Sequence, residues 1–149
     1  MVNTIKAPRA VKAVKTVLFV CVHNAGRSQM AEAFTNHLAQ KRGVAVRGLS
    51  AGTVAGDAIN PLAVAVMEEL GISLAGQHPK PLTQELADRS DRVITMGCGV
   101  DAEACPARIH LSEDWGLDDP KGQSLEAVRA IRDQIQMRVE TLLSEIVAP

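Results

Sequence analysis

The sequence predicts an α/β fold in which helices cover both faces of a parallel β-sheet. Short apolar runs with the composition of buried strands alternate along the chain with longer segments of helical periodicity. The first run, residues 16–21, passes through a short polar loop straight into a helical segment. Parallel strands are joined in this way, because each crossover needs a helix's length of chain. The 149 residues fit one domain with a substantial core.

The first half of the chain supplies two of the expected strands. Residues 16–21 are rich in Val and Phe, as in a strand buried on both faces. Residues 44–49 form the second strand, which is closed by residues 50–52. The helix between them begins at about Arg27 and ends near Gly43. An apolar residue recurs on this helix at every fourth position, at Met30, Phe34 and Leu38.

A second helix is expected to begin at Asn60 and Pro61. Asn is a favoured N-cap residue, and Pro suits the first helical position because no backbone donor is needed there. Gly71 is placed to end this helix. One face of it carries Leu62, Val66 and Leu70.

The second half adds two strands and two helices. We expect a short helix after residues 81–83, and strands at 92–96 and 108–111. Right-handed crossovers bring the carboxyl ends of parallel strands to one edge of the sheet, where the ligand crevice lies. The last helix starts at Ser124, and its core-facing residues are Val128, Ile131, Ile135, Val139, Leu142 and Ile146.

The loop after the first strand carries the main functional signal. Cys21 ends the strand, and Arg27 opens the helix, so the loop places backbone N–H groups at a helix N-terminus, where anions bind. The same positive potential favours the thiolate form of Cys21. Arg27 can hold two oxygens of an oxyanion, Ser28 can donate to the sulfur, and Gly26 permits close approach of the backbone. A buried cysteine that lies near an arginine by chance is the simpler alternative.

Composition and charge argue against several classes of function. The formal net charge of −1 provides no field that would attract nucleic acid or an anionic membrane, and no apolar run could span a bilayer. Residues 1–15 are basic and lack the pattern of a signal peptide, so we expect a flexible extension before a single domain at 16–149. Three cysteines without an export signal indicate the cytoplasm, where stable disulfides are rare.

The segment Cys21-Val-His-Asn-Ala-Gly-Arg27-Ser28 resembles the C-x5-R-[ST] signature of low-molecular-weight protein tyrosine phosphatases. Its continuation through Glu32 is similar to the arsenate reductases of the same fold. The resemblance resumes at 50–52, 93–96 and 114–120, and so covers most of the chain from about residue 16. It implies a flavodoxin-like, three-layer fold with four parallel strands, in which the first strand lies beside the third.

The resemblance also assigns roles around the loop. Some relatives bind potassium with Asn, Glu and Ser side chains at the matching positions. Here residues 78–81 lack the Thr and Asp that complete that site, and the amine of Lys80 can take the place of the cation. The residues expected to bind the oxyanion are Val22, His23, Asn24, Ala25, Gly26, Arg27 and Ser28, and those expected to order the loop are Asn24, Ser28, Glu32 and Ser50.

The sequence Asp118-Asp119-Pro120 resembles the loop that supplies the general acid of this family. The matching residue is Asp119, which would protonate the oxygen that leaves the oxyanion. Phosphatases of the family commonly have tyrosines after this Asp-Pro, and these tyrosines pack on the phosphotyrosine ring. The chain contains no Tyr, which disfavours a phosphatase. Trp115 is the one remaining aromatic candidate, and packing beneath the acid loop explains it equally well.

Cys98 and Cys105 resemble the redox pair of thioredoxin-coupled arsenate reductases. The resemblance implies that Cys21 attacks arsenate, Cys98 then attacks Cys21, and Cys105 attacks Cys98. Thioredoxin would be the external reductant, phosphate or sulfate would compete with arsenate, and no bound metal or organic cofactor is expected. Seven residues of helix span about 10.5 Å, whereas a disulfide needs Cα atoms within roughly 7 Å, so any helix here must unwind first. Buried thiols or a metal site are the alternatives.

Three other functions stay open at this point. The first is a low-molecular-weight phosphatase, in which water replaces Cys98 as the second nucleophile. The second is an arsenate reductase that uses mycothiol or another small thiol. The third is a protein that binds oxyanions or senses redox state without catalysis, although Cys21, Arg27 and Asp119 together argue against it.

Overall fold

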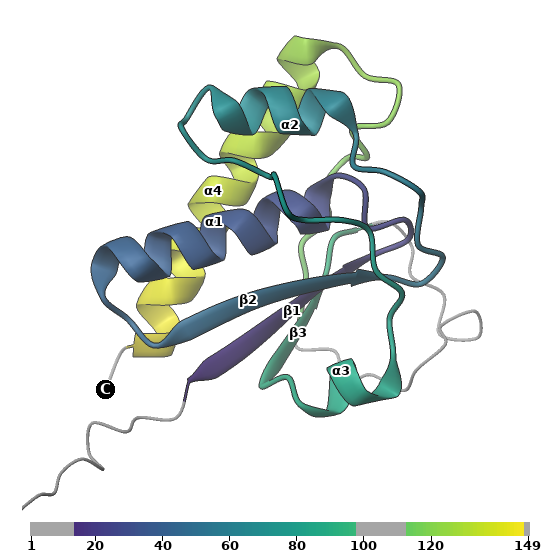
Figure 1. Ribbon diagram of the computed structural model, residues 1–149. Helices are drawn as coiled ribbons and strands as arrows, with labels where there is room; N and C mark the ends of the chain where they lie inside the picture. The colour runs from purple at the N-terminus through teal and green to yellow at the C-terminus, as the bar shows by residue number, and fades with distance from the viewer. Residues whose placement is uncertain (1–13, 98–112, 148–149) are drawn as a thin grey trace, which may run out of the picture.

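The computed structural model describes residues 14–97 and 113–147, which form a parallel sheet covered by helices (Figure 1). Within these residues the sheet has four strands in the order β2-β1-β3-β4. Every neighbouring pair is parallel, so the predicted fold class is confirmed, and so is the pairing of the first strand with the third. The strands are β1 (Lys15–Cys21), β2 (Val46–Gly52), β3 (Arg92–Thr95) and β4 (Glu113–Asp114).

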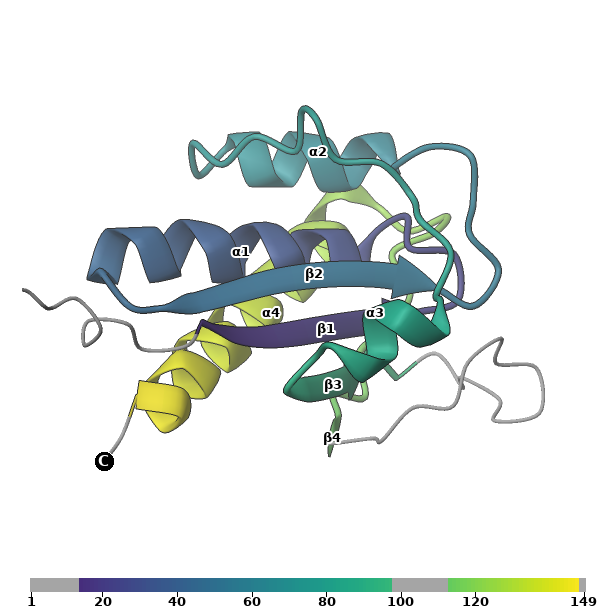
Figure 2. The same ribbon diagram turned by 60° about the horizontal axis from the view of Figure 1, so that its bottom comes forward.

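Helices lie on both faces of the sheet, as Figures 1 and 2 show. One face is covered by α1 (Arg27–Arg42) and α4 (Leu125–Val147), with α2 (Pro61–Glu68) packed on their outer side. The short helix α3 (Gln84–Asp88) lies on the opposite face. The sheet is therefore the central layer, and its carboxyl-terminal edge carries the loop between β1 and α1.

The central strand β1 divides the core into two clusters. Successive side chains of a strand point to opposite faces of the sheet, so one apolar run can serve both faces. Val17 and Phe19 face the larger cluster, which α1, α2 and α4 complete. Leu18 and Val20 face the smaller cluster, to which Leu82 contributes from the chain before α3. All four β1 side chains are fully buried, as the apolar run predicts.

The helix boundaries follow the capping residues closely. Gly43 ends α1 in the left-handed conformation, with φ of 67°. The side chain of Asn60 accepts a hydrogen bond from Leu62 N at 2.9 Å, with Pro61 at the first helical position. Ser124 Oγ accepts from Ala127 N at 3.1 Å and so caps α4. These predicted boundaries are confirmed.

Two predicted boundaries are wrong. Helix α2 ends at Glu68 instead of running to Gly71, because Leu70 N bonds to Met67 O three residues back and tightens the last turn. Leu70 is consequently 41% exposed. Ile72 takes the buried position that the periodicity predicts for Leu70. Strand β2 starts at Val46 and not at residue 44, since the backbone of 44–45 makes the turn after α1, and it runs to Gly52. The strand expected at 108–111 lies outside the described residues, and β4 is at Glu113–Asp114.

An ion-pair network joins α2 to α4. The guanidinium of Arg129 donates to both carboxylate oxygens of Glu69, at 2.9 and 2.7 Å. The buried Arg132 donates to the same carboxylate at 2.7 Å and to Val66 O at 2.9 Å. Hydrogen bonding from Arg129, followed by that from Arg132, lowers the pKa of Glu69 to about 2.

The substitution Glu69→Gln should therefore destabilise the protein at neutral pH and have little effect in acid. Because the pKa of Glu69 is lower in the folded state, its contribution is complete above its ordinary pKa of 4.5 and disappears as the pH falls towards about 2. Urea unfolding of the wild type and the variant at pH 7 and at pH 2.5 measures this difference. The matched control is Glu68→Gln, on the neighbouring exposed residue. An equal loss of stability from both variants at pH 7 would contradict the prediction.

Candidate active site

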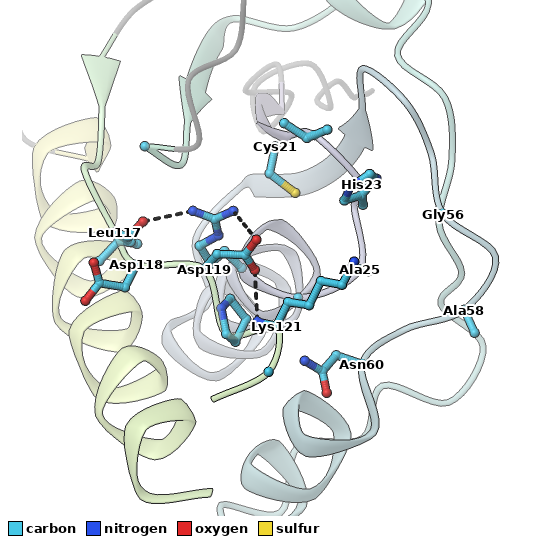
Figure 3. A pocket seen from close by; sticks show the side chains of 16 residues that line it. Cys21, His23, Ala25, Gly56, Ala58, Asn60, Leu117, Asp118, Asp119 and Lys121 are labelled. Atoms are coloured by element: carbon cyan, nitrogen blue, oxygen red, sulfur yellow. Dashed lines mark hydrogen bonds and ion pairs between the residues drawn. The ribbon is translucent and has the colours of Figure 1, made fainter. Parts of the chain in front are cut away.

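A pocket of about 840 Å³ opens at the carboxyl end of β1 (Figure 3). Its floor is Cys21 and the loop that follows, and one wall is the chain of residues 117–122. The segment around Gly56 and Asn60 forms the other wall. The pocket thus lies at the edge of the sheet where the sequence predicts the ligand crevice.

The backbone of the loop is held with its carbonyl groups turned away from the pocket. Four of these carbonyls accept hydrogen bonds from backbone N–H groups of the segment 53–60, at 2.7–3.1 Å. The peptide unit is planar and trans, so a carbonyl that faces outward turns the next N–H inward. The donors Thr53, Val54, Gly56 and Asn60 bind the carbonyls of Cys21, Val22, His23 and Ala25, respectively.

The inward N–H groups are available to a ligand. Within residues 14–97 and 113–147, no group accepts a hydrogen bond from the backbone N–H of His23, Ala25, Gly26 or Arg27. These residues line the pocket, so an acceptor that enters it can bind the unpaired N–H groups. A concave array of N–H groups at the start of α1 is a typical site for a phosphate-like anion.

Close packing leaves no room for side chains at two glycines of the site. A Cβ on Gly52 would lie 2.6 Å from Val22 O, so the loop rests directly on the backbone at the end of β2. A Cβ on Gly26 would lie 2.8 Å from Cγ of Pro120, so the wall formed by residues 117–122 packs directly on the loop. Asn24 completes the turn with a positive φ of 53°.

Two hydrogen-bond donors point at the sulfur of Cys21. Asn24 N donates to Sγ at 3.1 Å, and Ser28 Oγ lies 2.9 Å from it. Ser28 Oγ already accepts a hydrogen bond from Asn24 Nδ2 at 2.7 Å, so its own proton is free to point at the sulfur. Both contacts stabilise a negative charge on Cys21, as expected for a nucleophile.

Arg27 is buried and presents one edge of its guanidinium to the pocket. Nη1 is occupied by Met96 O at 3.1 Å and Leu117 O at 2.8 Å. Nε is buried without a hydrogen-bond partner, and Nη2 lies 3.8 Å from the carboxylate of Asp119. The Nε–Nη2 edge can therefore bind two oxygens of one oxyanion.

Asp119 lies above this edge in a tight turn. Its Oδ1 accepts from Lys121 N at 3.0 Å, while Oδ2 faces Arg27 (Figure 3). Pro120 packs against Gly26 and holds the turn over the loop. The side chain of Asp119 is 55% exposed, so it can exchange its proton with solvent. Cys21, Arg27 and Asp119 thus converge on one pocket, as the sequence predicts.

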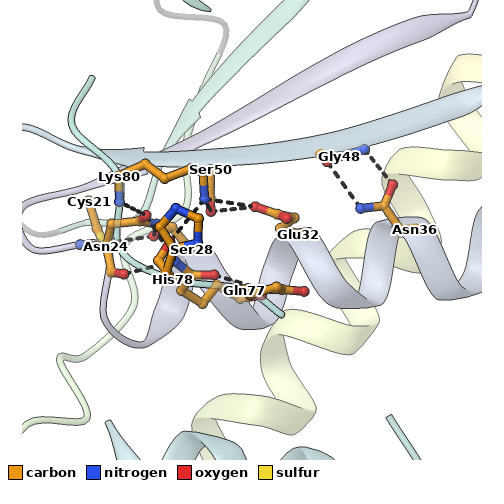
Figure 4. A network of polar contacts seen from close by, with 11 residues as sticks. Cys21, Asn24, Ser28, Glu32, Asn36, Gly48, Ser50, Gln77, His78 and Lys80 are labelled. Atoms are coloured by element: carbon orange, nitrogen blue, oxygen red, sulfur yellow. Dashed lines mark hydrogen bonds and ion pairs between the residues drawn. The ribbon is translucent and has the colours of Figure 1, made fainter. Parts of the chain in front are cut away.

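A polar network behind the loop holds Asn24 in place (Figure 4). Asn24 Oδ1 accepts from Gln29 Nε2 and from Lys80 N, each at 2.9 Å. Gln29 Nε2 also contacts Asn24 O at 3.0 Å, and Gln77 Nε2 donates to Gln29 Oε1 at 2.7 Å. Sequence reasoning missed Gln29 and Gln77. Gln29 is next to the apolar stripe of α1 in the sequence, but only the structure shows that it is buried.

Lys80 occupies the polar cluster that contains Glu32 and Ser50. Its ammonium lies 3.6 Å from Glu32 Oε1 and 3.4 Å from Ser50 Oγ, and it donates to His78 O at 3.2 Å. Ser50 Oγ in turn donates to Glu32 Oε1 at 2.5 Å. The lysine charge therefore sits among the side chains with which some relatives bind a cation.

The remaining residues that the sequence singles out lie in the loop, in the core or outside the described parts of the chain. The backbone carbonyl of Val22 and the Nδ1 of His23 both contact Val54, and the His23 side chain is exposed. Trp115 is 2% exposed and packs on Phe19, so it is a core residue and not part of a substrate slot. Cys98 and Cys105 lie outside the described residues. The basic extension, residues 1–15, is described only from residue 14, and Lys15 begins β1.

Comparison with known proteins identifies relatives of this chain. A family model described as low molecular weight phosphotyrosine protein phosphatase matches residues 16–148. The glutaredoxin arsenate reductase of Synechocystis is 44% identical over 135 residues, covering 89% of this chain and 99% of the relative. Within residues 14–97 and 113–147, no helix combines the length and apolar character needed to span a membrane, and no His, Cys, Asp and Glu cluster could hold a metal.

Solved structures give the same picture. A structure of an arsenate reductase in the phosphate-binding state has a TM-score of 0.76 and 41% identity, covering 89% of this chain and 99% of that one. A thioredoxin-dependent arsenate reductase of Corynebacterium glutamicum has a TM-score of 0.73 and 37% identity. That match covers 91% of this chain and 63% of the other.

The substitution Lys80→Met should lower stability and weaken the binding of inorganic phosphate. It leaves the carboxylate of Glu32 without its cation, which should cost about 2 kcal/mol in the free energy of unfolding. Thermal unfolding and calorimetric phosphate titration in potassium chloride and in choline chloride of equal ionic strength measure both effects. Potassium should partly restore the variant and leave the wild type unchanged. A potassium requirement in the wild type would contradict the role of Lys80.

Proposed function

The chain belongs to the low molecular weight phosphotyrosine protein phosphatase family, and on this premise we propose that it reduces arsenate to arsenite. The observation that carries the proposal is the sulfur of Cys21 at the floor of a pocket in which Arg27 Nε and the inward N–H groups of the loop have no acceptor among residues 14–97 and 113–147. These donors suit a tetrahedral oxyanion. The names of the relatives, arsenate reductases at up to 44% identity, favour arsenate over a phosphate ester as the substrate.

In the first step the thiolate of Cys21 attacks arsenic, and one arsenic–oxygen bond breaks. The loop N–H groups and the Nε–Nη2 edge of Arg27 hold the oxygens that remain, and they compensate the charge that develops on them. Asp119 gives its proton to the departing hydroxyl group of arsenate, which leaves as water. Arsenic is still pentavalent in the resulting adduct with Cys21.

The reduction takes place in the second step. The thiolate of Cys98 attacks the sulfur of Cys21, a sulfur–sulfur bond forms, and the electron pair of the sulfur–arsenic bond stays on arsenic. Arsenic thereby gains two electrons and leaves as arsenite, while the two cysteines lose two. Gly97, the residue before Cys98 in the sequence, lines the pocket, which supports the assignment of Cys98 as the attacking group.

Regeneration requires an external dithiol. Cys105 attacks Cys98, which frees Cys21 and leaves a disulfide between Cys98 and Cys105. Thioredoxin then reduces this disulfide, and the proposal places the protein in the cytoplasm, where thiols are kept reduced. The relatives' names include both a glutaredoxin-dependent and a thioredoxin-dependent reductase, so glutaredoxin is the alternative reductant. A tyrosine phosphatase activity on the same loop is the alternative reaction.

The relay predicts that Cys98→Ser and Cys105→Ser each abolish multiple turnovers. Both variants keep Cys21 and its surroundings, so alkylation of Cys21 by iodoacetamide should proceed as in the wild type. The measurement is NADPH oxidation with arsenate, thioredoxin and thioredoxin reductase. Cys21→Ser is the inactive control.

The outcome also separates the alternatives. Full activity of Cys105→Ser with glutathione and glutaredoxin, or with mycothiol, would show that a small-thiol system, and not Cys105 with thioredoxin, completes the reduction. Rapid cleavage of para-nitrophenyl phosphate without any arsenite formed would show that the protein is a phosphatase and not a reductase.

The substitution Asp119→Asn should reduce kcat for arsenate by about 10²–10³-fold, because the departing oxygen loses its proton donor. The Kd for inorganic phosphate should not rise, since Asp119 is not one of the loop donors and its carboxylate, 3.8 Å from Arg27, offers an anion no favourable charge. Asp118→Asn removes the same charge one residue earlier and should lower kcat far less. Equal effects of the two substitutions on kcat would reject Asp119 as the acid.

A further inference from the structure

Two side chains on the outer wall of the pocket have no part in the steps above. Lys121 and Asn60 both line the pocket, from opposite sides of its opening. In Figure 3, the side chain of Lys121 extends across the opening towards Ala25, and the amide of Asn60 lies on the far side. Cys21 and Arg27 line the same pocket. The outer wall therefore adds polar groups beyond the loop and Arg27.

Lys121 brings an unpaired positive charge to this opening. Its backbone N–H donates to Asp119 Oδ1 at 3.0 Å, which fixes the start of its side chain in the acid turn. No carboxylate or other acceptor within residues 14–97 and 113–147 pairs with its ammonium group. Asp118 and Asp119 place two carboxylates on the same wall as Lys121, so an entering anion gains from the lysine charge beside them.

Asn60 brings a second donor. Its Oδ1 caps α2 by accepting from Leu62 N at 2.9 Å, and its backbone N–H donates to Ala25 O at 2.7 Å. These two bonds fix the side chain and leave Nδ2 without an acceptor in the described parts of the chain. The nitrogen of the amide faces the opening in Figure 3.

We propose that Lys121 and Asn60 form the outer half of the oxyanion site and make it selective for free tetrahedral oxyanions. The inference rests on the proposed function and names the feature of the substrate that the outer wall recognises. An anion with three oxygens in the loop turns its fourth substituent to the opening. In free arsenate or phosphate this substituent is an oxygen or a hydroxyl group, which can accept hydrogen bonds from Lys121 and Asn60. In an ester or an arylphosphonate this substituent is or carries an organic group, which Lys121 and Asn60 cannot bind.

The test is the affinity of the full-length protein for inorganic phosphate, measured by calorimetry. Lys121→Met should raise the Kd by ~10-fold and reduce its dependence on ionic strength, because one local charge is lost. Lys121→Arg keeps the charge and should bind as the wild type does. Lys41→Met removes the same charge from the end of α1, away from the pocket, and should leave the Kd unchanged.

Phenylphosphonate tests the selectivity. It has the same three oxygens for the loop, but it presents a phenyl ring to the opening. Lys121→Met should therefore change its Kd by less than about threefold, against the ~10-fold expected for phosphate. Equal losses for both ligands, or no loss for phosphate, would overturn the proposal.

Asn60→Asp tests the second donor with little disturbance of the fold. Asp is as good an N-cap as Asn, so thermal stability should be retained, while an anion replaces the donor at the opening. Phosphate binding should weaken, and unchanged binding would overturn the role of Asn60. If the wild type binds phosphate but forms no arsenite from arsenate, the proposed function fails and the role of the outer wall stands.

Discussion

The site depends on one constraint, which is that every carbonyl of the anion-binding loop must face away from the anion. A single carbonyl oxygen turned inward would repel an oxyanion and remove an N–H donor from it. Each carbonyl from residue 21 to residue 26 is therefore bound from outside. The donors come from the extension of β2, from the N-terminus of α2, from the Gln29 side chain and from the backbone of α1. Because Gln29 belongs to α1, three separate elements, the extension of β2, α2 and α1, fix the backbone of these six residues.

Gly52 is where these supports meet. It pairs with Cys21 in the sheet, its N–H donates to Lys80 O and its carbonyl accepts from Leu82 N, both at 2.8 Å. The loop lies directly on its backbone, so no side chain fits there. The same contacts bring Lys80 beside Glu32, so that one junction positions both the loop and the cation behind it. The ion pairs between α2 and α4 have a related role, because they hold the helix whose first residues bind Ala25.

The fold and the inner site could be predicted because they rest on local patterns. The apolar run of β1 and the capping residues determine local structure, and the Cys21–Ser28 segment carries its functional side chains within one short stretch. Gln29, Gln77 and Lys121 could not be found in this way, since their roles come from contacts with residues far away in the sequence. The early end of α2 has the same origin, because Ile72 fills the core position that periodicity gives to Leu70.

The inner site alone does not separate a reductase from a phosphatase. Attack of Cys21 on a tetrahedral centre and protonation of the departing oxygen by Asp119 are common to both reactions. The reactions differ in the substituent that faces the opening and in the nucleophile that next attacks the sulfur adduct. The first difference concerns Lys121 and Asn60, and the second concerns Cys98. On the proposed function, specificity thus depends on the outer wall of the pocket and on the second nucleophile, while the loop provides a chemistry that either reaction can use.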